Sequence, residues 1–148
     1  MGGAAGGPPV RAVIVNWNTR EHLDRCLAAL AADAAAGLAE VVVVDNASTD
    51  GSAELVAERH PWAELVASGV NLGFGRGANL GLRGSRSAWA LVLNADVELT
   101  EGSVGRLLAA GEADPTAGIV APRLISARGT DPVFAFPSVV RTALEVIG

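Results

Sequence analysis

Residues 41–52 read VVVVDNASTDGS, and this stretch decides the fold. Four consecutive valines are typical of a strand buried on both faces, as in parallel sheets covered by helices. Asp45 follows the valines directly, and ligands of open α/β sheets bind just beyond the carboxyl ends of such strands. A second apolar run, residues 91–93, leads in the same way to Asn94 and Asp96. We therefore expect Asp45 and Asp96 to face one crevice.

Strands and helical segments alternate on both sides of this stretch. Strands are predicted over residues 10–15, 40–44, 64–67, 89–93 and 118–121. Helices are predicted between them, over residues 18–37 with Asn18 as the N-cap, from about residue 50 to 59, within residues 73–82, and from Thr100 to about residue 114. This alternation predicts an α/β fold with a mostly parallel sheet and helices on both faces.

The composition indicates one globular domain. A chain of 148 residues buries roughly 70% of the surface that its unfolded form exposes. No apolar run approaches the ~20 residues that a membrane-spanning helix requires. The net charge of -5 and the absence of Lys/Arg clusters argue against nucleic-acid binding, which depends on a basic face. The single cysteine, Cys26, excludes an internal disulfide, is consistent with a reducing compartment, and lies on an apolar helical stripe that predicts a core position.

The chain divides into three regions by composition. Residues 1–9 consist of Met, Gly, Ala and Pro without a secretion signal, and they are expected to form a disordered tail. Residues 10–125 contain the alternating strands and helices. Residues 126–148 carry Val140, Leu144 and Ile147 at helical spacing. Such a face needs a surface to cover, and this domain, a partner chain, a membrane or a further half of the protein could each supply it.

Asp96 is the strongest candidate for a metal ligand. Mg²⁺ and Mn²⁺ prefer oxygen ligands, and Mg²⁺ is usually held by only one or two carboxylates, with phosphates and waters completing its shell. Asn94 lies two residues earlier and points to the same side of the strand, where its amide can bind a ribose hydroxyl. The alternative is that Asp96 only caps a turn before residues 97–99.

Asp45 suits the recognition of a pyrimidine base. An ionised carboxylate only accepts hydrogen bonds, and uracil and thymine each offer an imide N–H. The alternative is an Asx turn or a cap, because the polar run 45–52 is rich in residues that bond their own backbone. Only the combination with the other candidate sites favours base binding.

The remaining aromatic residues and histidines are predicted to have ordinary structural roles. Trp62 and Trp89 are expected to be core or half-buried packing residues, and Trp17 likewise unless it stacks on a base. His22 and His60 fall at helix ends and are expected to be solvated.

The glycine segment offers a different interpretation of the chain. Gly73, Gly75 and Ala78 match the dinucleotide-binding pattern G-x-G-x-x-G/A, and Asp96 follows at roughly the required distance. That pattern should begin directly at the end of a well-formed strand, whereas residues 68–72 intervene here. A dinucleotide-dependent oxidoreductase is therefore a remote alternative.

Four motifs in order resemble those of the family 2 glycosyltransferases with a GT-A fold, in particular the rhamnosyltransferase-like branch. They are residues 13–18 (VIVNWN), 44–52 (VDNASTDGS), 71–81 (NLGFGRGANLG) and 93–96 (LNAD). The resemblance covers about residues 10–124 and implies a Rossmann-like GT-A domain that binds a UDP- or dTDP-linked sugar, with rhamnose as one candidate. It further implies inverting transfer to an acceptor hydroxyl, a role in cell-wall or polysaccharide biosynthesis, and a cytoplasmic location that can include the inner face of the membrane.

The same resemblance implies roles for individual residues. Asp45 would receive the base, and Asn94 and Asp96 would stand in the D-x-D position, with Asp96 as the ligand of Mg²⁺ or Mn²⁺. The implied substrate-binding set also includes Asn16, Trp17, Asn18, Asn46, Asn71, Gly75, Arg76 and Asn79. The expected partners are a nucleotide-sugar donor, a glycan or lipid-linked acceptor and, for the apolar C-terminal segment, a second copy, a missing C-terminal half or a membrane surface.

No catalytic base is assigned within the chain. The family typically continues into a second half that shapes the acceptor site and supplies an acidic base, and no matching motif occurs before Gly148. The base is therefore expected beyond that residue, and the sequence is interpreted as a C-terminally truncated, donor-binding half. Two hypotheses follow, an active transferase and a catalytically incomplete nucleotide-sugar binder.

Overall fold

The computed structural model describes residues 7–122, 125–126 and 129–130. The chain divides into two units, Met1–Val104 and Gly105–Gly148. The first unit contains β1 (Val10–Asn16), α1 (Arg20–Ala35), β2 (Ala39–Asp45), α2 (Ser52–Arg59), β3 (Glu64–Ala67), α3 (Phe74–Gly81) and β4 (Trp89–Asn94). Helix α4 (Ser103–Ala113) begins with the last two residues of the first unit and continues into the second. The second unit also contains an antiparallel strand pair, β5 (Ile125–Ser126) and β6 (Gly129–Thr130).

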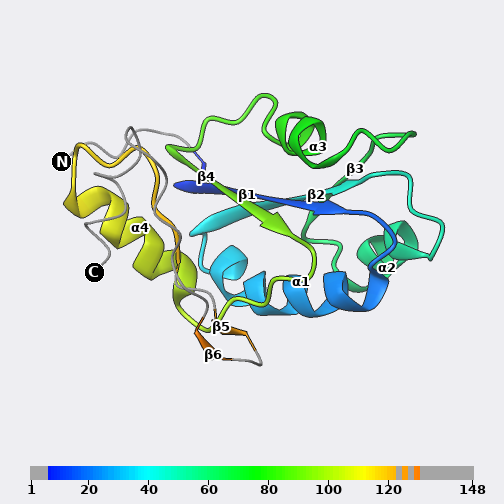
Figure 1. The fold of residues 1–148 in the computed structure, drawn as a ribbon, viewed down its shortest axis with the longest axis horizontal. Coiled ribbons are helices and arrows are strands. Elements are labelled where there is room, and N and C mark those ends of the chain that lie inside the picture. The colour runs from blue at the N-terminus through cyan, green and yellow to red at the C-terminus, as the bar shows by residue number, and fades with distance from the viewer. Residues whose placement is uncertain (1–6, 123–124, 127–128, 131–148) are drawn as a thin grey trace. The chain divides into compact units, whose positions relative to one another are not determined.

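The first unit is a four-stranded parallel sheet between helices. Its strand order is β3-β2-β1-β4. Helix α3 lies on one face, and α1 and α2 lie on the other (Figure 1). The chain moves outward from β1 through β2 to β3 and then returns to place β4 on the other side of β1. This reversal makes the carboxyl ends of β1 and β4 a topological switch point, where open α/β sheets form a crevice.

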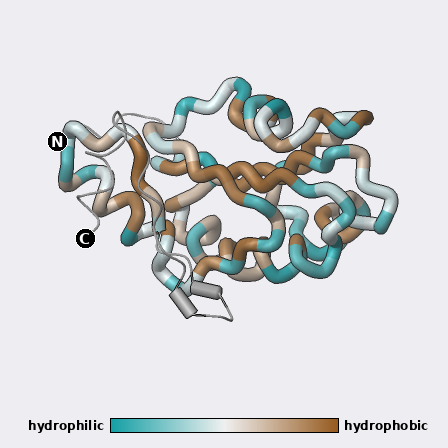
Figure 2. The backbone as a smooth tube through the Cα atoms, in the orientation of Figure 1, coloured by the Kyte–Doolittle hydropathy of each residue, from teal (hydrophilic) through white to brown (hydrophobic). Residues whose placement is uncertain are grey.

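The central strands of the sheet are hydrophobic along most of their length (Figure 2). Alternation of their side chains between the two faces separates two apolar layers. The buried cluster on the α3 side consists of Val13, Val15, Val42, Val44 and Ala78. The intervening strand residues face α1, whose buried apolar residues are Leu23, Cys26, Leu27 and Leu30. Burial on both faces explains why residues 41–44 are all apolar, and the predicted core position of Cys26 is confirmed.

Helix α3 approaches the sheet closely because two of its residues have no side chain. A Cβ on Gly81 would lie 2.4 Å from Val13 Cγ1 and 2.9 Å from Val44 Cγ2. A Cβ on Gly77 would lie 3.0 Å from Val15 Cγ1. The expected loop and helix within residues 73–82 are confirmed, with the helix beginning at Phe74.

Four of the five predicted strands are confirmed to within a residue at each end. The prediction of a fifth strand over residues 118–121 is wrong, because this stretch has no ladder partner among the described residues and runs into Pro122. The short β5–β6 pair was not predicted, since two-residue strands produce no recognisable alternation.

The predicted N-cap of α1 is also wrong. Thr19 occupies the N-cap position, while Asn18 has a φ of +53° and a side-chain oxygen that accepts a hydrogen bond from the Thr49 amide. Asn18 therefore serves the neighbouring loop rather than the helix. The predicted end of the helix is confirmed by Gly37, whose φ of +71° is the left-handed conformation that glycine adopts most readily.

Trp62 is 41% exposed, within the half-buried range expected, whereas Trp17, the expected exception, is 56% exposed. The prediction that His60 is solvated is wrong. His60 is buried because it packs edge-on against Trp62 and lies 2.7 Å from an Asp24 carboxylate oxygen. No helix within the described part of the chain is long and apolar enough to cross a bilayer. Residues 1–6 of the expected tail, and Val140, Leu144 and Ile147, lie outside the described residues.

Candidate functional site

A cleft of about 340 Å³ lies at the carboxyl ends of β1 and β4, where the strand order reverses. It opens on the α3 side of the sheet, because Val15 and Asn94 are register partners and Val15 belongs to the apolar cluster under α3. The lining residues are Val15, Trp17, Thr19, Asn46, Asn71, Gly73, Phe74, Asn94, Ala95 and Asp96.

Asp96 and Asn94 supply the polar end of this cleft. Both side chains are exposed, and the Asp96 carboxylate makes no hydrogen bond or ion pair with any described residue. Burial raises the pKa of the Cys26 thiol to about 12, and the negative charges of Asp96 and Glu98 add to that shift. The arrangement fits one divalent cation held by a single carboxylate, with ligand oxygens and waters completing the shell.

No cluster of three or more His, Cys, Asp or Glu side chains able to hold a metal exists among residues 7–122 and the two short strands beyond them. A cation in this cleft would therefore depend on Asp96 and on the oxygens of a bound ligand. A nucleoside diphosphate has phosphate oxygens of the required kind.

Asp45 lies in a separate polar network beside the cleft. The Asn16 amide donates to Asp45 Oδ1 over 3.1 Å, and the Ser48 backbone N–H donates to Asp45 Oδ2 over 3.0 Å. Asp45 is only 5% exposed and does not line the cleft. Because Val44 faces α3, strand alternation directs Asp45 to the opposite side of the sheet. The structure thus does not bring Asp45 and Asp96 into the one cleft expected from the sequence.

The loops after β1 and β2 are joined by further hydrogen bonds. The Ser48 hydroxyl accepts from the Asn18 backbone N–H over 3.0 Å, and Asp50 Oδ2 accepts from the Arg20 backbone N–H over 2.9 Å. Although burial opposes ionisation of Asp50, hydrogen bonds from Ser52 and from the Arg20 backbone outweigh it, and the pKa of Asp50 is lowered. The two loops therefore form one cross-linked wall beside the cleft.

Asn46 connects a third loop to this wall. Its side-chain Nδ2 donates to the Gly73 carbonyl over 3.3 Å, and its Oδ1 accepts from the Leu72 backbone N–H over 3.3 Å. The Ser68 hydroxyl also reaches Asn46 Oδ1 at 3.4 Å. Asn46 is 2% exposed, and its amide fixes the loop that precedes α3.

The cleft contains some of the predicted site residues and not others. Those that line it are Trp17, Asn46, Asn71, Asn94 and Asp96. Those that do not line it are Asn16, Asn18, Asp45, Gly75, Arg76 and Asn79. Gly75, Arg76 and Asn79 are exposed on α3, and Asn16 and Asn18 belong to the cross-linked loops.

Five lining residues were not predicted as site residues, namely Val15, Thr19, Gly73, Phe74 and Ala95. Phe74 is half-exposed at the first position of α3, and with Trp17 it gives the cleft two aromatic side chains. The available signal was a large apolar residue inside a glycine-rich segment next to candidate site residues. It was missed because apolar residues are normally assigned to the core.

Comparisons with known proteins identify the family. The family model for glycosyl transferase family 2 matches residues 12–135. The N-acetylglucosaminyl-diphospho-decaprenol L-rhamnosyltransferase of Mycobacterium tuberculosis (strain H37Rv) is 31% identical over 148 residues, covering 91% of this chain and 48% of the relative. The succinoglycan biosynthesis protein ExoO of Rhizobium meliloti is 32% identical over 107 residues, covering 72% of this chain and 30% of the relative. The chain thus spans about half the length of the rhamnosyltransferase relative and less than a third of ExoO.

Solved structures share the fold. The mannosyltransferase PcManGT of Pyrobaculum calidifontis, in complex with GDP-Man and Mn²⁺, is 30% identical with a TM-score of 0.63, covering 77% of this chain and 35% of that one. Residues 1–349 of TarS from S. aureus match at 17% identity with a TM-score of 0.62, covering 88% of this chain and 43% of that one. With the family match extending over most of its length, the chain belongs to glycosyltransferase family 2 and has the GT-A fold.

Proposed function

We propose that this chain forms the donor-binding part of a glycosyltransferase and binds a nucleoside-diphosphate sugar in the cleft through a divalent metal. The observation that carries the proposal is the exposed Asp96 carboxylate, which lines the cleft beside Asn94 and has no partner among the described residues. An exposed carboxylate without a partner can bind a cation without giving up an existing contact. Because Asp96 closely follows the end of β4, its carboxylate is also held at the cleft, where a cation could bind.

Mg²⁺ or Mn²⁺ would be held by Asp96, and the PcManGT structure with Mn²⁺ supports a metal of this kind. When bound, the metal stabilises the charge that develops on the leaving diphosphate. Asn94 lies on the same side of β4 and is suited to bind a ribose hydroxyl or a diphosphate oxygen. Arg76, exposed in the first turn of α3, is suited to phosphate oxygens, with Asn71, Gly75 and Asn79 nearby in sequence.

Asp45 is proposed to receive the base from the cross-linked loops. A carboxylate has about four acceptor positions, and hydrogen bonds from Asn16 and Ser48 occupy only two of them. An imide N–H of uracil or thymine can donate to one of the remaining acceptor positions of Asp45, which favours a UDP- or dTDP-linked donor. Trp17 is exposed beside these loops and can stack on a base, whereas Asn16, Asn18 and Asn46 hold the loops together.

The acceptor is proposed to be a glycan or a lipid-linked sugar, with rhamnose as one candidate for the group transferred. The relatives named for rhamnosyl transfer and for succinoglycan biosynthesis support this class and a role in cell-wall or polysaccharide biosynthesis. An acceptor carried by a lipid also favours a cytoplasmic position at the membrane surface. In this arrangement, residues 10–125 bind the donor and residues 126–148 connect to the acceptor side.

Inverting transfer further requires a base. The acceptor oxygen bonds to the anomeric carbon as the bond from that carbon to the diphosphate oxygen breaks, and the hydroxyl proton passes to the base. We propose that this base is supplied by a part of the protein outside these 148 residues. The chain spans 48% of the rhamnosyltransferase relative, and this favours a second candidate function, a nucleotide-sugar binder that is catalytically incomplete by itself.

Thermal unfolding with UDP, dTDP, GDP and NAD, each with and without Mn²⁺, tests donor binding. A ligand at about 100 times its dissociation constant adds ~2.7 kcal/mol and should raise the midpoint by roughly 5 to 10 °C. We expect a rise that requires both a pyrimidine nucleoside diphosphate and Mn²⁺. The rise should disappear in Asp96→Ala and persist in Glu58→Ala, which removes an exposed carboxylate from α2. Stabilisation by NAD without metal would instead favour the oxidoreductase.

Transfer assays separate the two candidate functions. The chain is incubated with a UDP- or dTDP-linked sugar, Mn²⁺ and a lipid-linked acceptor, and release of the free nucleoside diphosphate is followed. Sugar transfer by the chain alone would exclude the incomplete binder. Binding without transfer supports it.

A further inference from the structure

Helix α3 is poorly suited to form by itself. It has eight residues, FGRGANLG, and three of them are glycine. Isolated helices shorter than ~12–15 residues are marginal in water, and glycine is the least favourable residue after proline in a helix interior. The position of α3 must therefore depend on contacts with the rest of the protein.

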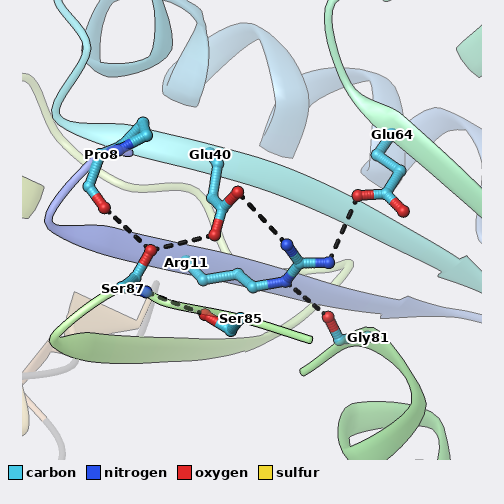
Figure 3. Close-up of polar contacts among 7 residues, drawn as sticks. All are labelled: Pro8, Arg11, Glu40, Glu64, Gly81, Ser85 and Ser87. Carbon is cyan, nitrogen blue, oxygen red and sulfur yellow. Dashed lines mark hydrogen bonds and ion pairs between the residues drawn. The ribbon is translucent and has the colours of Figure 1, made fainter. Parts of the chain in front are cut away.

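Arg11 makes one such contact at the C-terminal end of α3. It lies in β1 on the face under the helix and is only 9% exposed. Arg11 Nε donates to the Gly81 carbonyl over 2.7 Å (Figure 3). The last carbonyls of a helix have no partner within it, so this hydrogen bond supplies one.

The Arg11 guanidinium is itself held in place by two carboxylates. Nη1 lies 3.2 Å from a Glu40 oxygen, and Nη2 lies 3.3 Å from a Glu64 oxygen, so that β1, β2, β3 and α3 meet at one side chain (Figure 3). The other Glu40 oxygen accepts from the Ser87 hydroxyl over 2.9 Å. A planar guanidinium with donors on three sides is fixed in orientation by such a set.

Asn46 holds the opposite end of α3, where it binds the Gly73 carbonyl. Gly77, between these two ends, and Gly81, at the C-terminal end, rest directly on valines of the sheet. Gly73 and Phe74, at the N-terminal end, line the cleft. Movement of α3 along the sheet would therefore displace part of the cleft wall.

We propose that Arg11 is a positioning residue for the cleft and acts through α3. Arg11 and Val15, which lines the cleft, are four residues apart on β1, which corresponds to about 13 Å at ~3.3 Å per residue. A ligand in the cleft is therefore out of reach of the Arg11 side chain. Loss of the guanidinium frees the C-terminal end of α3, and the first turn of the helix loses its fixed position. The ligand-binding part of this proposal rests on the proposed function.

Hydrogen exchange of α3 in Arg11→Met tests the proposal without any ligand. Methionine keeps an unbranched apolar chain and removes every donor. We expect amides of residues 75–81 to exchange at least tenfold faster, with a much smaller change in α1. In Arg11→Lys, which keeps one donor group and the charge, we expect an intermediate rate.

Binding of UDP in the presence of Mn²⁺, measured by calorimetry, is the second readout. We expect the affinity of Arg11→Met to fall about five- to fiftyfold and that of Arg11→Lys to fall less. Leu30→Ala is the matched control, because it weakens the core beneath the other face of the sheet and leaves α3 and its contacts in place. It should lower the unfolding midpoint while α3 exchange and UDP affinity stay at wild-type values.

Two further variants cover the case in which Arg11→Met does not fold. Glu64→Gln removes the charge of the half-exposed partner and leaves Arg11 present, so a smaller rise in α3 exchange is expected. Gly75→Ala adds helix propensity where a Cβ meets nothing within 4 Å, and in the Arg11→Lys background it should restore part of the lost protection.

Unchanged α3 exchange in Arg11→Met, together with a lower unfolding midpoint, would overturn the proposal and leave Arg11 a general stabiliser. Faster exchange with unchanged UDP affinity would overturn its link to the cleft. If the wild-type chain binds no nucleoside diphosphate with Mn²⁺, the proposed function fails, whereas the exchange result still decides whether Arg11 positions α3.

Discussion

Asn16 is the residue on which the wall beside the cleft depends. It is fully buried, its Nδ2 donates to both Asp45 and Ser48, and its Oδ1 accepts from the Thr19 hydroxyl over 2.7 Å. Its role as a cross-link could not be foreseen, because a sequence does not indicate which polar residues of two separate loops will meet. The resemblance marked Asn16 as a site residue without this function.

Substitution of Asn16 should therefore destabilise the fold in a pH-dependent way. Asn16→Ala removes a donor from the buried Asp45 carboxylate and should cost about 1–3 kcal/mol. Asn16→Asp places a second carboxylate beside Asp45, which raises the pKa of one of the pair in the folded state and costs more stability at pH 7 than at pH 4. Urea unfolding of both variants at the two pH values measures the difference. An equal loss at both pH values for Asn16→Asp would contradict the expected repulsion.

Asp24 gives the wild-type protein a pH dependence of its own. A hydrogen bond with His60, together with the nearby charge of Arg59, lowers the pKa of the Asp24 carboxyl despite some burial. The unfolded chain then binds the proton more tightly than the folded one. This contribution to stability is present above the ordinary Asp pKa of about 3.9 and is lost as the pH falls through the lower folded value.

Asp24→Asn should remove that dependence. The variant is expected to be less stable than the wild type at pH 6, and the difference should shrink as the pH is lowered below about 4. Unfolding free energies measured in denaturant from pH 6 to 2.5 provide the comparison. Parallel curves over this range would show that the Asp24 contacts do not stabilise the ionised form.

At the scale of elements, α3 contains a matched pair of glycines. Gly81→Ala would place a methyl group 2.4 Å from Val13 Cγ1, and overpacking of this kind costs typically ~1–3 kcal/mol. Gly75→Ala meets nothing within 4 Å and should instead stabilise the protein by about 0.5–1 kcal/mol. Urea midpoints of the two variants should thus move in opposite directions. Similar midpoints would mean that α3 does not rest on the valines.

The elements also show where prediction from sequence succeeds. The buried strands were predictable because continuous burial leaves a run such as residues 41–44, and α1 because its apolar residues recur at helical spacing. The start of α1 was not predictable. Asparagine is a favoured N-cap residue, and the actual partner of Asn18, Thr49, lies 31 residues away in the sequence. Short-range patterns identify elements, whereas their ends depend on long-range contacts.

At the scale of the whole molecule, the switch point was predictable and the composition of the cleft was not. Asp45 and Asp96 were expected together because both follow apolar strands. The side of the sheet on which each carboxylate lies depends on strand alternation, and a run of four valines does not reveal which of them face α3. Asn46, one residue further along, faces the cleft in place of Asp45.

Among the described residues, β4 is an edge strand of the four-stranded sheet. Within the described part of the chain, β4 pairs with β1 only, and Val92 is 38% exposed. Unpaired edge strands with apolar residues promote association between chains. We expect sedimentation velocity to show reversible association that increases with concentration and is reduced in Val92→Lys. A wild-type chain that stays monomeric at high concentration would contradict this expectation.

The valine run has one further consequence, for how β1 and β2 find their alignment. The four valines alone distinguish poorly between neighbouring alignments, because a shift by one residue still places a valine opposite three of the four apolar residues 12–15. The polar ends can make this distinction. Arg11 is directly opposite Glu40 and Asn16 is directly opposite Asp45, and each pair is joined across the strands. A one-residue slip would break both links and exchange the faces of Asp45 and Asn46, so these two pairs encode the register that the valines leave open.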